Sequence, residues 1–160
     1  GGNANVKGVY FDEENRRHLL SIRLAYAQTA LRLALAGKKD EAISILDKAE
    51  KEIHPEALPY AMVSRDNRHN YLSKIYLDAA EMAGHTELAN KVRDALIKDF
   101  EDQIRYADYL MEQKPDFYSG DIAGDREFSR QMLDQLRKSK TVQPVPENVD
   151  TPPNDSDQQQ

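Results

Sequence analysis

The chain has 160 residues, enough for one domain with its own hydrophobic core and too few for two ordinary domains. The formal net charge is −6, but four of the 28 acidic residues and none of the 22 basic residues lie in residues 141–160, which leaves −2 on residues 1–140. A body this close to neutral lacks the clustered Lys and Arg of a nucleic-acid-binding protein. The absence of Cys excludes disulfides, zinc-thiolate sites and Cys nucleophiles.

The first predicted helix runs from the N-cap Asp12 to Ala36. Apolar residues recur at spacings of three and four and form one apolar face along this helix: Leu19, Ile22, Tyr26, Ala30 and Leu33. Further leucines form a second apolar face, so the helix is predicted to be buried on two sides: Leu20, Leu24, Leu31 and Leu35. This apolar run also holds Arg23 and Arg32, which are costly at bilayer depth, so we predict a packed helix and no direct membrane insertion.

Gly37 is expected to end the first helix at a position that requires a positive φ. A second helix is predicted from about Asp40 to Pro55, because proline cannot continue a helix. The third helix is predicted from Tyr60 or Asp66 to Ala83, and the next residue is again a glycine.

The fourth predicted helix starts at Thr86, which is expected to be its N-cap. It carries an apolar stripe of more than six turns: Leu88, Val92, Leu96, Phe100, Ile104, Ala107 and Leu110. A helix of this length must meet either a fifth helix or a partner.

A loop is predicted over residues 114–124, where Pro and Gly residues punctuate the chain. A last helix is predicted from Asp121 or Asp125 to Ser139. No segment alternates apolar and polar residues as a strand does, so the predicted fold class is all-α, built of antiparallel helical hairpins.

The predicted domain organisation has three parts. Residues 1–9 are small and polar and are expected to be a linker, and residues 10–140 form the helical domain. Residues 141–160 are acidic and rich in proline, with too little apolar surface to offset their ordering entropy, so they are predicted to be disordered. The chain starts without Met, which suggests a piece of a longer protein.

Gly37 and Gly84 lie 47 residues apart, and each is followed by a similar helical pattern. The first pattern resembles the second helix of a tetratricopeptide repeat, in its small, large, small and proline positions: Ala42, Leu46, Ala49 and Pro55. The preceding helix matches at Tyr26, Ala30 and Leu33. The second unit departs from the pattern, since Arg93 occupies the large apolar place and Leu96 the small one. The resemblance implies about two repeats with the last helix as a C-terminal cap, and a plain helical bundle is the alternative.

The opening VYFDEENRR and the following helical pair carry a second resemblance, at these positions: Tyr10, Asp12, Glu13, Asn15, Arg17, Pro59 and Tyr60. This pattern resembles the soluble C-terminal region of a bacterial family of multi-pass membrane proteins of unknown function, akin to the protein O-mannosyltransferases. It implies an appended domain on the periplasmic side of the inner membrane, with any glycosyl-transfer chemistry in the parent's membrane region. A free-standing cytoplasmic adaptor is the alternative.

No group of residues forms a recognisable catalytic site. The four His residues lack metal-ligand spacing, no nucleophile elbow or phosphate loop is present, and we predict no catalytic residue, no metal and no cofactor. Arg16 and Arg17 are suited to bind an anion, but Glu13 and Glu14 precede them, so local ion pairs are the favoured interpretation.

The tetratricopeptide resemblance places a concave partner-binding surface on the first helix of each unit. The partner-binding residues that this alignment predicts are Leu24, Leu31, Tyr71, Lys74, Asp78 and Glu81. The favoured alternative is that Leu24 and Leu31 are covered by later helices of the same chain. The function expected is a non-catalytic interaction or scaffolding domain for a protein or peptide, and the parent's own membrane region is one candidate partner. The alternative is an accessory domain that binds a peptide or glycan acceptor.

Overall fold

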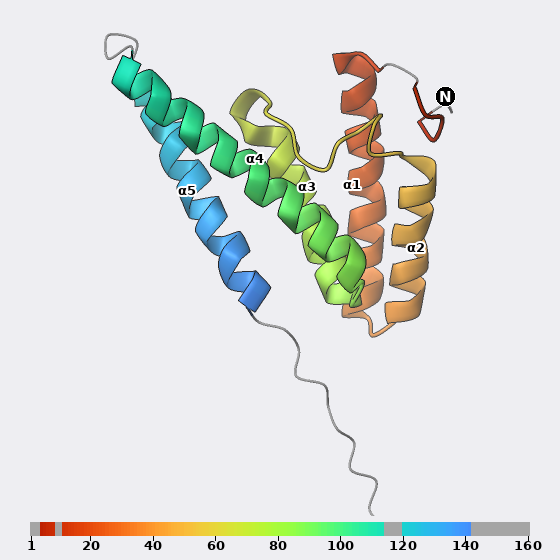
Figure 1. Cartoon of the computed structure of the whole chain (residues 1–160). Helices are drawn as coiled ribbons and strands as arrows, with labels where there is room; N and C mark the ends of the chain where they lie inside the picture. The colour runs from red at the N-terminus through yellow and green to blue at the C-terminus, as the bar shows by residue number, and fades with distance from the viewer. Residues whose placement is uncertain (1–3, 9–10, 114–119, 142–160) are drawn as a thin grey trace, which may run out of the picture.

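The computed structural model describes residues 4–8, 11–113 and 120–141. Within these residues the chain forms five α-helices and one short 3-10 turn: α1 (Glu13–Leu35), α2 (Lys39–Glu52), η1 (Arg65–Asn67), α3 (Arg68–Ala83), α4 (Thr86–Gln113) and α5 (Gly120–Thr141). The all-α prediction is confirmed. The helices pack in antiparallel pairs: α1 contacts α2 and α3, α3 contacts α4, and α5 runs back along α4 (Figure 1).

The two glycine turns have the same geometry. Gly37 and Gly84 adopt φ values of 79° and 81°. At each turn the residue after the glycine donates its N–H back into the preceding helix, from Lys38 to the Leu33 carbonyl and from His85 to the Ala80 carbonyl. These are Schellman caps, which require a left-handed residue that glycine adopts without strain. The prediction that α1 and α3 end at these two glycines is therefore confirmed, and the positive φ of each glycine is the cause.

The buried face of α1 agrees in part with the predicted one. The residues in the interior are Leu19, Leu20, Arg23, Ala27, Ala30 and Ala34, of which Leu19, Leu20 and Ala30 belong to the predicted apolar faces. The prediction is wrong for Ile22 and Leu35, which are 47% and 68% exposed. Small alanines, rather than the larger leucines, thus form the central contact, because they let α2 and α3 approach α1 closely.

The structure corrects the start of the third helix and the N-cap of the fourth, whereas α4 itself begins at Thr86 as predicted. The third helix begins at Arg68, after a turn in which Asp66 and Asn67 adopt left-handed conformations. At the start of α4, Thr86 is not the N-cap, because its hydroxyl donates to the Gly84 carbonyl. The ring of His85 accepts the Leu88 N–H at 3.4 Å and caps the helix instead.

The C-terminal half of α4 is covered by a fifth helix, as its length required. Phe100 of α4 meets Phe128 of α5 edge to face, with ring centroids 6.2 Å apart. The ion pairs Arg126–Asp108 and Arg137–Glu101 also join the two helices. α5 starts at Gly120, so residues 120–124, predicted as loop, are helical.

The described part of the predicted linker, residues 4–8, lies against the helices. Ala4 is buried beside Leu19 and Leu58, and its carbonyl accepts the His54 N–H at 2.8 Å. The remainder of the predicted 114–124 loop, residues 114–119, lies outside the described residues. The predicted disordered tail also lies outside them, except for Thr141, the last residue of α5.

The contrast between two glycines gives a stability prediction. Gly84→Ala should lower the free energy of unfolding by about 1–2 kcal/mol, because an L-residue is strained at this left-handed position. Gly124→Ala, inside α5, should raise it by about 0.5–1 kcal/mol. An added Cβ meets nothing within 4 Å at either site, so backbone conformation alone separates the two. Urea unfolding measures both, and equal shifts would contradict the assigned conformations.

Candidate functional site

A connecting segment, residues 53–64, links α2 to η1 and contains no regular secondary structure beyond turns. Its backbone polar groups therefore need partners from side chains. Arg23 of α1 supplies two of them: its guanidinium is 2% exposed and donates to the carbonyls of Leu58 at 2.6 Å and Pro59 at 3.0 Å. A buried cation on α1 thus fixes the path of a segment 35 residues away.

Two tyrosines connect this cation to a carboxylate on α2. The guanidinium of Arg23 lies 5.3 Å from the ring centroid of Tyr60 and 5.6 Å from that of Tyr76. Both hydroxyls donate to Glu50, the Tyr76 hydroxyl at 2.8 Å. Burial and the hydrogen bonds to Glu50 raise the pKa of both tyrosines, so both remain protonated donors. This group of Arg23, Tyr60, Tyr76 and Glu50 is called the arginine clamp below.

His69 and Asn70, at the start of α3, hold the same segment from the other side. His69 Nε2 lies 2.9 Å from the Pro59 carbonyl, and its backbone N–H donates to the Ser64 hydroxyl. Asn70 accepts the Met62 N–H at 3.0 Å and donates to Asp99 of α4 at 2.6 Å. Burial lowers the pKa of His69, and the nearby Arg23 adds to this, so the imidazole is neutral near pH 7.

A cleft of about 320 Å³ opens between the N-terminal turns of α1 and the start of α3. Four arginines line it: Arg16, Arg17, Arg65 and Arg68. The carboxylates of Glu13 and Asp66 also line it, which leaves a formal surplus of two positive charges. Arg17 pairs with Glu13 at 2.6 Å, as the sequence led us to expect. We call this hollow the cationic cleft.

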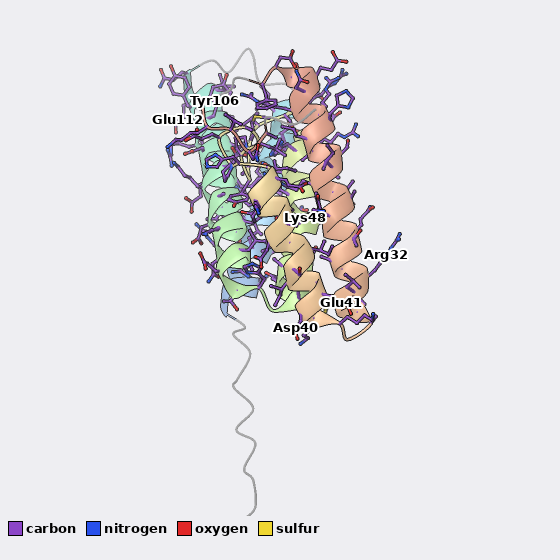
Figure 2. All side chains as sticks on the ribbon, turned by 90° about the vertical axis from the view of Figure 1, so that its right-hand side faces the viewer. Arg32, Asp40, Glu41, Lys48, Tyr106 and Glu112 are labelled. Carbon is purple, nitrogen blue, oxygen red and sulfur yellow. The ribbon has the colours of Figure 1, made fainter. Side chains whose placement is uncertain are left out.

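A second hollow, of about 410 Å³, lies between α4 and α5. Tyr106 and Leu110 of α4, Ile122 of α5 and Val63 of the connecting segment line it. The side chains of Tyr106 and Val63 are 64% and 65% exposed. Figure 2 shows Tyr106 on the upper part of α4. We call this hollow the aromatic groove.

The connecting segment contributes to both hollows. Met62 and Ser64 line the cationic cleft, whereas Val63 lines the aromatic groove. Successive side chains of an extended chain point to opposite sides, and Ser64 has the φ and ψ of an extended residue. One stretch of three residues therefore separates the two sites.

The structure distributes the six predicted partner-binding residues as follows. Leu24 and Leu31 of α1 are half-buried, and Leu31 packs against the main core. On α3, Tyr71 is 59% exposed and Lys74 pairs with Asp78. Glu81 accepts a hydrogen bond from the buried Arg93 of α4, so its contact runs toward α4. Whether these residues bind a partner stays a prediction.

The cationic cleft and the aromatic groove were not anticipated from the sequence as sites. The only sequence signal for the cleft was the pair Arg16 and Arg17, because Arg65 and Arg68 join them through tertiary packing. Across the described ranges, no helix is long and apolar enough to cross a bilayer. In the same residues no three His, Asp or Glu side chains gather closely enough to hold a metal ion.

The chain matches no protein-family model, no curated protein and no solved structure. What is shown is an all-helical arrangement of five α-helices in the described residues, and no family is identified. The chemistry of its surfaces has to be argued from the residues that line them.

The arginine clamp gives a second stability prediction. Arg23→Leu should lower the free energy of unfolding by about 3–5 kcal/mol, because it leaves the buried Leu58 carbonyl without its donor and Glu50 without its nearby cation. The Pro59 carbonyl loses one of its two partners and keeps His69. The matched control is Arg32→Leu, on an exposed position of the same helix, which should change it by less than about 0.5 kcal/mol. Similar effects of the two substitutions in urea unfolding would contradict the role assigned to Arg23.

His69 gives a pH prediction. Its folded pKa is lowered, whereas the unfolded imidazole titrates near pH 6.5. Below about pH 6.5 the unfolded state binds a proton that the folded state rejects, so stability should fall as the pH drops from 6.5 toward the folded pKa. The slope contributed is at most about 1.4 kcal/mol per pH unit. His69→Gln should flatten the dependence measured by urea unfolding at several pH values.

Gln28, an exposed residue of α1 that carries no titratable group, provides the control for this measurement. Gln28→Ala should leave the pH dependence between 6.5 and 5 unchanged. A wild-type stability that stays constant over that interval would show that His69 is not held neutral by burial.

Proposed function

We propose that this chain is a non-catalytic interaction or scaffolding domain that binds a protein or peptide partner. The aromatic groove is the observation that carries the proposal. It combines Tyr106, Val63 and Leu110 with the ion pair Arg126–Asp108. The exposed Tyr106 in an apolar hollow suits a binding surface, because tyrosine adds large contact area at little entropic cost and is enriched at binding hot spots.

The two helical hairpins support a repeat-like architecture for this domain. The caps at Gly37 and Gly84 are alike, and at the same spacing of 47 residues Ala42 and Ala89 are both buried. Arg93, which stands where the first hairpin has Leu46, is also buried and pairs with Glu81. A tetratricopeptide-like interpretation, with α5 as the cap, is consistent with this correspondence and remains part of the proposal.

The proposed context is a larger membrane protein. The resemblance of the opening residues to the soluble C-terminal region of a membrane-protein family supports a domain appended on the periplasmic side, with the parent's membrane region as one possible partner. The full-length gene tests this directly. A reading frame that continues upstream into hydrophobic spans supports it, and one that starts at this domain leaves the cytoplasmic adaptor.

A second candidate function is accessory binding of a peptide or glycan acceptor. The exposed ring of Tyr71 beside the Lys74–Asp78 pair favours it, because aromatic rings and adjacent polar groups are suited to extended polar ligands. Titration of saccharides and of extended peptides into isotope-labelled protein should then shift the NMR resonances of these three residues. Resonances that do not move would exclude this accessory role.

Photo-crosslinking tests the interaction function. Tyr106→p-benzoylphenylalanine, irradiated in the cells that naturally express the chain, should give a discrete adduct that mass spectrometry can identify. The same substitution at Lys48, which lies on α2 well away from the aromatic groove, should give none (Figure 2). The partner so identified should bind the purified Tyr106→Ala variant at least about ten-fold more weakly, since an interface hot spot contributes about 1.4 kcal/mol or more.

Two results would contradict the interaction function. One is equal adduct formation at positions 106 and 48, which indicates random collision. The other is unchanged affinity of the identified partner for Tyr106→Ala, provided that the variant keeps its unfolding midpoint.

A further inference from the structure

The cationic cleft brings together arginines from two distant parts of the sequence. Arg16 and Arg17 lie in the first turns of α1, while Arg65 and Arg68 flank the left-handed turn before α3. Asp66 and Asn67 in that turn have φ values of 55° and 50°, an unusual conformation for two consecutive residues other than glycine. The packing of α1 on α3 and the shape of this turn together produce the cationic lining.

Two of the arginines in the cleft have weak local partners. The Arg17–Glu13 pair is exposed by 75% and 82%, and the Arg65–Asp66 pair, at 3.9 Å, by 96% and 89%. Exposed ion pairs of this kind contribute little, because water screens them and long side chains must be ordered to form them. A ligand that brings its own carboxylates can therefore replace Glu13 and Asp66 at small cost.

The floor of the cleft is apolar, in contrast to its rim. Leu20 is 8% exposed, and Leu72 and Met62 are partly buried beside it. His69, also in the lining, is 2% exposed and neutral. Such a floor is suited to an aliphatic or aromatic side chain, while the guanidinium groups at the rim are suited to carboxylates, which they can bind through two parallel hydrogen bonds.

We propose that the cationic cleft binds an acidic peptide segment, with carboxylates at the arginine rim and an apolar side chain on the floor of Leu20, Met62 and Leu72. A peptide is favoured over a phosphate group, because the lining joins exposed arginines to buried apolar residues, and a phosphate group would leave the apolar part unused. The proposal goes beyond the function proposed from the aromatic groove, because it concerns a second surface and names the chemistry of its ligand. Residues 142–160 of the chain show the required character, with Glu147, Asp150, Asp155 and Asp157 and no basic residue.

The test uses the full-length 160-residue chain and fluorescence anisotropy. The first ligand is a labelled peptide of alternating Glu and Leu with both ends blocked, and its control replaces every Glu by Gln. We expect the Glu peptide to bind, to lose at least ten-fold in affinity between 50 and 500 mM NaCl, and to shift the NMR resonances of Leu20 and Ser64. Equal binding of the Gln peptide, or binding of inorganic phosphate alone with the same shifts, would overturn the proposal.

Matched charge variants locate the binding site. The double variant Arg65→Glu and Arg68→Glu should bind the Glu peptide at least ten-fold more weakly. Asp66→Asn should bind it two- to five-fold more tightly, because it removes a competing carboxylate and asparagine tolerates the left-handed backbone. The control is Arg32→Glu, which projects from the other end of α1 and should keep wild-type affinity (Figure 2). Equal losses in the double variant and in the control would overturn the proposal.

Two further comparisons identify which chain supplies the acidic segment, and distinguish failure of the cleft proposal from failure of the interaction function. A blocked peptide of residues 142–160 that binds more tightly than the Glu and Leu peptide would assign the acidic segment to this chain or to a second copy. Weaker binding would assign it to a different protein. If the crosslink at Tyr106 forms but no acidic peptide binds, the cleft proposal fails and the interaction function stands.

Discussion

The contact of Arg23 with the carbonyls of Leu58 and Pro59 is the constraint on which the rest of this molecule depends. The connecting segment crosses from α2 to α3 with only a few backbone hydrogen bonds of its own, so the polar groups that its turns leave unpaired need side chains from the helices. Arg23 is buried on α1, the tyrosines that lie beside it come from the segment and from α3, and Glu50 comes from α2. One guanidinium thereby joins three helices and the segment that connects them.

The position of the connecting segment determines both candidate surfaces. With Leu58 and Pro59 fixed by Arg23 and with Met62 fixed by Asn70, the stretch from Met62 to Ser64 has little freedom. Its alternate side chains then face the cationic cleft on one side and the aromatic groove on the other. A buried polar network of this kind holds surface groups in place before any partner arrives, which reduces the entropy that binding has to overcome.

The helices were predictable because their signals are local. Gly37 and Gly84 end helices because each adopts a positive φ, which glycine does without strain. The apolar stripe of α4 has the period of a helix. Hydrophobicity predicted only part of the buried face of α1, namely Leu19, Leu20 and Ala30. Close helix contact added Ala27 and Ala34 and left Leu35 outside. The spacing of Arg23 from Leu19 and Ala27 was a usable signal, because it places a charge within a buried stripe.

The candidate sites were harder to predict than the fold, because they depend on contacts between distant residues. Arg65 and Arg68 belong to the cleft only because Asp66 and Asn67 adopt left-handed conformations, which no propensity assigns to two such residues in sequence. Both residue types tolerate that region better than most, and the buried Asn70 and His69 hold the following turn in place. The left-handed turn at Asp66 and Asn67, the buried His69 and the arginine clamp are thus joined through the connecting segment. Together they position residues that line the cationic cleft. A fold that needed only stability could have replaced these polar groups with a packed apolar core. These polar groups instead join the connecting segment, which lines both surfaces, to α1, α3 and α4.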